Sequence, residues 1–208
     1  MEKSVFTIVA GANGSGKSSL YEDVLSPNTV YFNGDLIFEQ LQKKYVNISK
    51  ESVGGAVASV LERTVLNAIE SKKNFAFETN FSVRMAVDML KNFKENGFET
   101  NLIYVGINST DIAKERVNIR TLKGGHDIPD DLIKFNYEEG CKNVNKYLPH
   151  FDRIVFVDNS SNIGKSKIVA EYDKKLQTKI ILNEKIEWFN KNFRENFLNL
   201  KAENQIDT

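Results

Sequence analysis

The sequence has a single cysteine, Cys141, so no disulfide bond can form within the chain. A chain without disulfides suits a reducing compartment, and we expect a cytoplasmic protein. No run of apolar residues approaches the roughly 18 that a membrane span needs, and no signal peptide precedes the first expected strand. We therefore expect no membrane partner, and we expect Cys141 to serve in packing.

The chain also lacks an excess of charge of either sign, with 28 basic and 28 acidic residues. Without a basic field, nucleic acid is not an expected partner. Arginine is scarce, yet Arg116 and Arg120 lie one helical turn apart. Because the guanidinium group binds phosphate with a planar fork, this pair is a candidate anion clamp rather than two ordinary surface residues.

At 208 residues, the chain is long enough for one α/β domain, which we expect over residues 1–208, with 201–208 as a frayed tail. Apolar periodicity predicts strands at 5–9, 29–33, 74–77, 102–107 and 153–157, and a β-hairpin at 168–172 and 179–182. Helices are predicted at 17–25, 36–45, 49–72, 83–96, 110–122, 130–147 and 184–200. The alternation predicts a mainly parallel sheet with helices on both faces, as in P-loop NTPases and kinases.

One stretch fits a phosphate-binding loop at every fixed position: GANGSGKS, from Gly11 to Ser18, follows the first strand and opens a helix. Glycines let backbone N–H groups curl around phosphate, and the helix points its positive end at the same anion. Lys17 would hold the β- and γ-phosphates, and the Ser18 hydroxyl would bind Mg²⁺. The expected ATP contacts are Gly11, Ala12, Asn13, Gly14, Ser15, Gly16, Lys17, Ser18 and Ser19.

Polar residues at other strand ends are expected to meet this loop, because ligands of such sheets bind beyond the carboxyl ends of the strands. Asp35 follows the second strand and is the candidate base for an acceptor hydroxyl. It could instead hold Mg²⁺ through a bound water, or act as the N-cap of the next helix. Glu78 and Thr79 follow the third strand. Glu78 could bind substrate or orient a metal-bound water, or it could be a carboxylate in an ordinary turn. With Lys17, Arg116 and Arg120, these residues suggest a phosphotransferase.

Several motifs together resemble the zeta toxin family over about residues 5–161. They are AGANGSGKSSL, YFNGD, FAFETNFS, the arginine pair, GGHDIP and VDNSS, in that order. Zeta toxins are bacterial P-loop kinases whose best-known members phosphorylate UDP-N-acetylglucosamine and are blocked by a cognate antitoxin. The resemblance implies ATP and Mg²⁺ as cofactors, Asp35 as the base, and Glu78, Thr79 and Ser82 as sugar-nucleotide contacts. It also implies that Lys17 clamps the phosphates together with Arg116 or Arg120. His126, in GGHDIP, is more often structural than catalytic as a lone loop histidine.

The chain departs from the family at Asn136, where an arginine usually precedes the tyrosine after the GGH segment. If that arginine stabilises the transferred phosphate, its loss could cost several kcal/mol of transition-state stabilisation. Lys134 is the candidate to substitute for it in part, as a point charge. Two alternatives therefore stay open beside the sugar-nucleotide kinase. One is a phosphotransferase for an antibiotic or metabolite, and the other is an ATP-binding interaction module with little transfer.

Overall fold

Parallel strands form the centre of the molecule. The computed structural model describes residues 3–122, 125, 128–161 and 166–201. The strands within these residues are β1 (Val5–Ala10), β2 (Val30–Phe32), β3 (Phe75–Thr79), β4 (Glu99–Gly106), β5 (Arg153–Asp158), β6 (Lys167–Asp173) and β7 (Thr178–Ile181). They form one sheet in the order β2–β3–β1–β4–β5–β6–β7, in which β1 to β5 are parallel and β6 and β7 are antiparallel.

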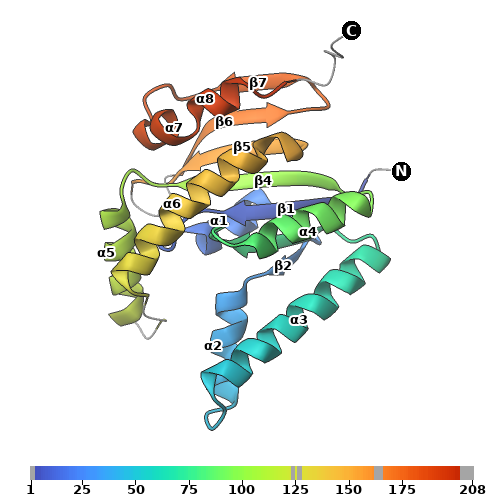
Figure 1. The fold of residues 1–208 in the computed structure, drawn as a ribbon, viewed down its shortest axis with the longest axis vertical. Helices are drawn as coiled ribbons and strands as arrows, with labels where there is room; N and C mark the ends of the chain where they lie inside the picture. Colours follow the sequence, from blue (N-terminus) through green and yellow to red (C-terminus); the bar gives the residue numbers. More distant parts are fainter. Residues whose placement is uncertain (1–2, 123–124, 126–127, 162–165, 202–208) are drawn as a thin grey trace.

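Helices cover both faces of this sheet. Their bounds are α1 (Lys17–Val24), α2 (Gly34–Lys44), α3 (Lys50–Glu70), α4 (Arg84–Glu95), α5 (Thr110–Leu122), α6 (Asp130–Tyr147), α7 (Glu187–Asn192) and α8 (Arg194–Leu198). In Figure 1, α4 and α6 cross in front of the sheet and α1 lies behind it. A short 3₁₀ turn, Leu148–His150, follows α6. No helix in the described part of the chain is long and apolar enough to cross a membrane.

Alternate residues of β4 show why both faces need a cover. Leu102 and Tyr104 point into the large core beneath α4 and α6, whereas Ile103 and Val105 pack with Leu20 of α1 on the opposite face. A strand buried on both faces reads as a continuous apolar run, as the central strand of a parallel sheet does. The predicted α/β, P-loop kinase-type fold is confirmed.

Three details differ from the prediction. The expected helix over 184–200 is two short helices, α7 and α8, which break at Phe193 (φ −130°). The aromatic stripe still packs into the large core. The sequence pattern predicts Asp130 and Asp131 as the cap of α6, but the cap is Pro129. The two aspartates lie in the first turn, where negative charge interacts favourably with the helix dipole. The third strand continues to Thr79, so Glu78 and Thr79 are strand residues rather than loop residues.

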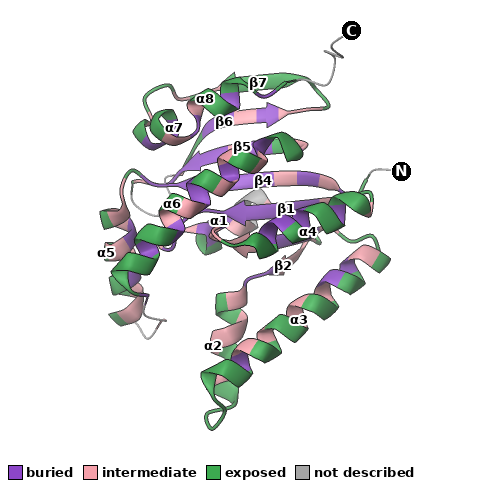
Figure 2. Ribbon diagram, in the orientation of Figure 1, coloured by how far each residue is buried: buried purple, intermediate pink, exposed green. Residues whose placement is uncertain are grey.

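The helices α2 and α3 form an arm that extends from the sheet edge at β2 (Figure 1). None of the residues of α2 is buried, and only Val53, Val65 and Ala68 of α3 are. Figure 2 shows this contrast between the exposed arm and the buried central strands. One side of the site described next is therefore built on a lightly packed element.

Candidate active site

The phosphate loop connects the end of β1 to the start of α1. Gly14 and Gly16 have φ values of +73° and +93°, which strain residues with a side chain. A Cβ at Gly14 would lie 2.5 Å from the carbonyl oxygen of Ala113 on α5, and one at Gly16 would collide with the Asn159 amide. Neighbouring backbone thus packs against the loop from outside, and the two glycines permit that close approach.

Lys17 begins α1 and is buried, with 6% of its surface exposed. Its ammonium group donates to the carbonyl oxygens of Gly11 (2.8 Å) and Ala12 (2.9 Å) and to Oδ1 of Asn80 (3.3 Å). Burial lowers the pKa of Lys17, while the Glu78 and Asp35 carboxylates oppose that shift. The Lys17 amine is thus held against the loop, within electrostatic range of the Glu78 and Asp35 carboxylates.

A polar cluster joins the start of α1 to the ends of β2 and β3. The Ser18 hydroxyl lies 3.0 Å from both carboxylate oxygens of Glu78, and the Asn33 amide donates to the Ser18 oxygen at 3.2 Å. The Tyr31 hydroxyl also donates to Glu78. Burial, with the Glu78 carboxylate adding to it, raises the pKa of Tyr31, which keeps its hydroxyl a donor. Glu78 is therefore oriented from two sides rather than free in a turn.

This cluster fits the oxygen ligands that Mg²⁺ prefers. The Ser18 hydroxyl and the Glu78 carboxylate lie next to the loop that would carry the phosphates, in contact with each other. No group of three histidine, cysteine or acidic side chains in the described residues forms a metal cage.

Asp35 lies in the first turn of α2, exposed toward the cavities described below. The cap of α2 is Asn33, whose side chain accepts from the Leu36 N–H at 3.1 Å. The alternative that Asp35 is the N-cap is therefore wrong. Because Asn33 supplies that bond, the Asp35 carboxylate is left to face the site.

The predicted arginine pair lies on α5, facing the loop. Arg116 donates to the carbonyl oxygens of Gly14 (3.4 Å) and Ser161 (2.8 Å), and Arg120 lies within electrostatic reach of Lys17. Gly125 packs against Arg120, and its N–H donates to the Arg120 carbonyl oxygen at 3.0 Å. The pair thus lies beside the loop, whereas Gly124, His126 and Asp127 lie outside the described residues.

Asn136, where the family resemblance leads us to expect an arginine, connects the loop to the turn after β3. Its amide donates to Oδ1 of Asn13 (2.8 Å), and its own Oδ1 accepts from Ser82 (2.7 Å). Asn80 donates to the same Asn13 oxygen at 3.2 Å. Asn136 is 8% exposed, so its role is an uncharged internal contact between the loop and the turn. The Ser82 hydroxyl is occupied by its hydrogen bond to Asn136.

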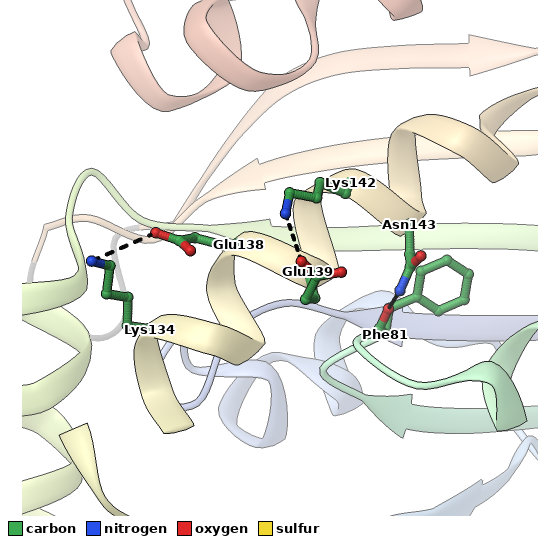
Figure 3. A network of polar contacts seen from close by, with 6 residues as sticks. All are labelled: Phe81, Lys134, Glu138, Glu139, Lys142 and Asn143. Atoms are coloured by element: carbon green, nitrogen blue, oxygen red, sulfur yellow. Dashed lines mark hydrogen bonds and ion pairs between the residues drawn. The ribbon is translucent and has the colours of Figure 1, made fainter. Parts of the chain in front are cut away.

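Lys134 does not take the place of the absent arginine. Its ammonium group lies 4.0 Å from Glu138 on the exposed side of α6, with 66% of the side chain accessible (Figure 3). One turn further along this helix, Lys142 pairs with Glu139 at 2.6 Å. These surface pairs leave the site without a cation from α6 among the described residues.

The turn after β3 is strained and held by α6. Phe81 has φ +59°, which is uncommon for a residue with a side chain. Its carbonyl oxygen accepts from the Asn143 amide at 3.0 Å (Figure 3), and its N–H donates to the Thr79 hydroxyl at 3.0 Å. A Cβ at Gly140 would lie 2.5 Å from the Asn80 carbonyl oxygen, so α6 touches this turn directly. These contacts fix Asn80 beside Lys17.

The end of β5 supports the loop from the other side. The Asn159 amide donates to the Ser15 carbonyl oxygen at 2.7 Å. The preceding residue, Asp158, is buried and accepts from the indole N–H of Trp188 at 2.8 Å. The α7 helix thus reaches the phosphate loop through two consecutive residues.

Two cavities meet at this site. The first, which we call the donor cavity, has about 500 Å³ and is lined by the loop, α2 and α5. The second, the acceptor cavity, has about 670 Å³ and lies between α2, α3, α4 and the ends of β2 and β3. Both are lined by Lys17, Asn33, Asp35 and Glu78. Thr79 lines the acceptor cavity, whereas Ser82 lines neither of the two.

Sequence reasoning did not single out Tyr31, Asn33, Asn80 and Trp188. The first three lie within YFNGD and FETNFS, at strand ends that it had already marked. These residues could have been found because they are polar and lie within a few positions of Asp35 or Glu78 in the sequence. No local pattern predicts the role of Trp188, because its contact with Asp158 spans 30 residues. Cys141 is buried as expected, and burial raises its pKa to about 11.

Comparisons with known proteins identify the family and the fold of this chain. The family model for zeta toxin matches residues 1–177. A Haemophilus influenzae protein described as uncharacterized is 30% identical over 135 residues, which is 65% of this chain and 92% of that protein.

Two solved structures show the same fold. One, from work on the PezAT chromosomal toxin–antitoxin system of Streptococcus pneumoniae, has a TM-score of 0.64 at 18% identity. That match covers 85% of this chain and 74% of the other. A chain of the AvrRxo1-ORF1:-ORF2 complex with ATP has a TM-score of 0.67 at 13% identity. That match covers 91% of this chain and 63% of the other. The fold is thus a kinase-like nucleotide-binding fold, and the chain belongs to the zeta toxin family.

Proposed function

We propose that this protein is an ATP-dependent phosphotransferase that acts on a hydroxyl group of a small molecule. The observation that carries the proposal is the meeting of two cavities at Lys17, Asp35 and Glu78. A kinase needs one site for the nucleotide and one for the acceptor, with the transferred phosphoryl group between them. A protein that only binds ATP needs the first site alone.

In the proposed reaction, the acceptor oxygen attacks the γ-phosphorus of ATP while the bond to the β,γ-bridging oxygen breaks. ADP leaves with that electron pair, and the hydroxyl proton passes to the Asp35 carboxylate. Lys17, Arg116 and Arg120 stabilise the charge on the phosphoryl oxygens. Bound Mg²⁺, held by Ser18 with Glu78 beside it, would supply further charge neutralisation at the β- and γ-phosphates.

Two acceptors are proposed from the sequence. Family membership favours a UDP-N-acetyl sugar such as UDP-N-acetylglucosamine, with Glu78 and Thr79 as contacts. An antibiotic or metabolite without a nucleotide would use the same catalytic parts. Family membership also favours an antitoxin that covers the nucleotide site. We therefore propose a protein partner for the donor side in addition to a small molecule for the acceptor side.

The test is an Asp35→Asn variant, which keeps the shape of the side chain and removes the base. ATP affinity should stay within about twofold, while phosphate transfer should fall at least 100-fold. Transfer is measured by mass spectrometry of products from a metabolite extract, with Lys17→Ala as the inactive control. Unchanged transfer in Asp35→Asn would remove Asp35 from the mechanism. A wild-type protein that binds ATP and yields no phosphorylated product would instead be an ATP-binding module.

A further inference from the structure

The two cavities carry opposite kinds of charge. Apart from the residues they share, the donor cavity is lined by three basic side chains, Arg116, Arg120 and Lys43, and one acidic side chain, Glu39. The acceptor cavity adds no basic side chain among the described residues, and its own charged residue is Glu62 of α3. The groups that neutralise phosphate are therefore gathered on the donor side.

Lys17 does not offset this imbalance on the acceptor side. It is the one basic side chain that lines the acceptor cavity in the described part of the chain, against the carboxylates of Asp35, Glu62 and Glu78. Its ammonium group is already bonded to Gly11, Ala12 and Asn80. When ATP binds, the same amine is needed by the nucleotide phosphates.

A nucleotide sugar brings a diphosphate with two negative charges. Proteins usually bind such groups with arginine, lysine or several backbone N–H groups from a helix start. Asn136 is uncharged and is already bonded to Asn13 and Ser82. Lys134 is turned toward Glu138 (Figure 3). A diphosphate would thus lie among carboxylates without a counter-charge from these residues.

Besides its charged residues, the acceptor cavity is lined by the uncharged polar side chains of Asn33, Thr79, Asn80 and Asn92 and by apolar side chains. The apolar side chains come from β2, α3, β3 and α4 and include Phe32, Val57, Leu61, Val65, Phe77 and Met89. Apolar walls bind ligands by removing apolar surface from water, and methionine adapts to irregular shapes. A cavity of about 670 Å³ has room for a drug-sized molecule with an apolar body.

From these observations we infer that the acceptor is an amphiphilic amino alcohol that carries no phosphate. Its hydroxyl lies at Asp35, its apolar body lies against the α3 and α4 wall, and its protonated amine pairs with Glu62. The Glu62 side chain makes no ion pair or hydrogen bond with any described residue and is exposed at the cavity. The inference rests on the proposed phosphotransferase for the position of the hydroxyl, and it replaces the nucleotide sugar as acceptor.

Four sugar probes separate charge from apolar surface: N-acetylglucosamine, UDP-N-acetylglucosamine, octyl N-acetylglucosaminide and octyl glucosaminide, whose amine is free. Binding is measured by titration calorimetry with the full chain, Mg²⁺ and a non-hydrolysable ATP analogue, below the concentration at which the octyl compounds form micelles. Octyl glucosaminide should bind most tightly. Both octyl compounds should bind at least tenfold more tightly than UDP-N-acetylglucosamine. Tighter binding of UDP-N-acetylglucosamine than of octyl N-acetylglucosaminide would overturn the inference.

Variants at Glu62 test the position of the amine. Glu62→Gln should weaken octyl glucosaminide about threefold to fivefold and leave octyl N-acetylglucosaminide unchanged, as expected for a partly exposed ion pair. Glu62→Lys should raise the affinity for UDP-N-acetylglucosamine. Glu70→Gln, on the same helix but outside the cavity, is the matched control and should change neither compound. Equal losses for both octyl compounds in Glu62→Gln would contradict the proposed pair.

Because binding is measured without turnover, this test is separate from that of the phosphotransferase. If the binding order holds but no compound in a metabolite extract is phosphorylated, the proposed reaction fails and the ligand class stands. If transfer occurs and the product is a nucleotide sugar, the reaction stands and the ligand class is overturned.

Discussion

The donor and acceptor cavities share three reactive side chains but are built in different ways. The donor side is made of backbone that neighbouring elements hold at close range, with α5 against Gly14 and Asn159 against Ser15 and Gly16. The acceptor side is made of side chains of β2, β3, α3 and α4, and few residues of α3 are buried. Packing around the loop of the donor side is thus dense, whereas one wall of the acceptor cavity belongs to the exposed arm.

This difference indicates which cavity can accept amino-acid substitutions without loss of the fold. A phosphate cradle depends on glycine conformations and on carbonyl and N–H groups, so almost any side chain there is harmful. The arm contributes apolar side chains and Glu62, which can be exchanged at a small cost in packing. Substrate choice can therefore vary in proteins that share this nucleotide site.

The largest effect is expected from Gly14→Ala on the donor side. The new Cβ would lie 2.5 Å from the Ala113 carbonyl oxygen, at a residue with φ +73°. The left-handed conformation alone costs about 1–2 kcal/mol, and the loop must also shift away from α5. ATP affinity, measured by calorimetry, should fall at least 100-fold.

Gly97→Ala is the matched control for that change. Gly97 has φ +80° just after α4, but a Cβ there would meet nothing within 4 Å. It should lower the free energy of unfolding by about 1 kcal/mol and leave ATP affinity unchanged. A loss of ATP affinity in both variants would mean that strain anywhere in the chain, rather than the cradle, is responsible.

Trp188→Phe is the next largest and tests the support behind the donor side. It removes the indole N–H that donates to buried Asp158, so a carboxylate loses a partner. The free energy of unfolding should fall by about 2 kcal/mol in chemical denaturation, and ATP affinity should fall a few fold because Asn159 is less well held. Tyr172→Phe, which removes a hydroxyl bonded to the Lys201 carbonyl oxygen, should lower stability without affecting ATP. Equal ATP affinities in the two variants would show that Trp188 does not support the loop.

Much of the donor side could be predicted from sequence, because its function depends on local order: glycine spacing, a preceding strand and a following helix. The acceptor side could not be predicted in the same way. Asp35 and Glu78 were found because strand ends converge in a parallel sheet. Leu61 and Met89 line the acceptor cavity, but in the sequence they show only the apolar periodicity of a helix. The roles of Asn136 and Trp188 depend on contacts that span 123 and 30 residues, which no local pattern encodes.

Leu61→Ala should act on the acceptor side alone. Leu61 lines the acceptor cavity and is partly buried, so truncation removes apolar wall without exposing the core. The affinity for octyl N-acetylglucosaminide should fall about tenfold, equivalent to ~1.4 kcal/mol, and ATP affinity should not change. Leu132→Ala, at an exposed residue of α6 that lines neither cavity, is the control. Loss of ATP affinity in Leu61→Ala would show that the two cavities are not independent.

The smallest effect concerns α6, which supports both sides through Asn136 and Gly140. Burial raises the pKa of Cys141 from its ordinary 9.0 to about 11. Between these values the unfolded chain loses the thiol proton first, so the folded state binds more protons and its stability falls as pH rises. The wild type should lose about 1 kcal/mol between pH 8.5 and pH 10 relative to Cys141→Ala, in urea unfolding at each pH. Because the thiol is protonated near pH 7, the difference between the two proteins should be constant below pH 8. A difference that is constant up to pH 10 would mean that the thiol ionises equally in both states.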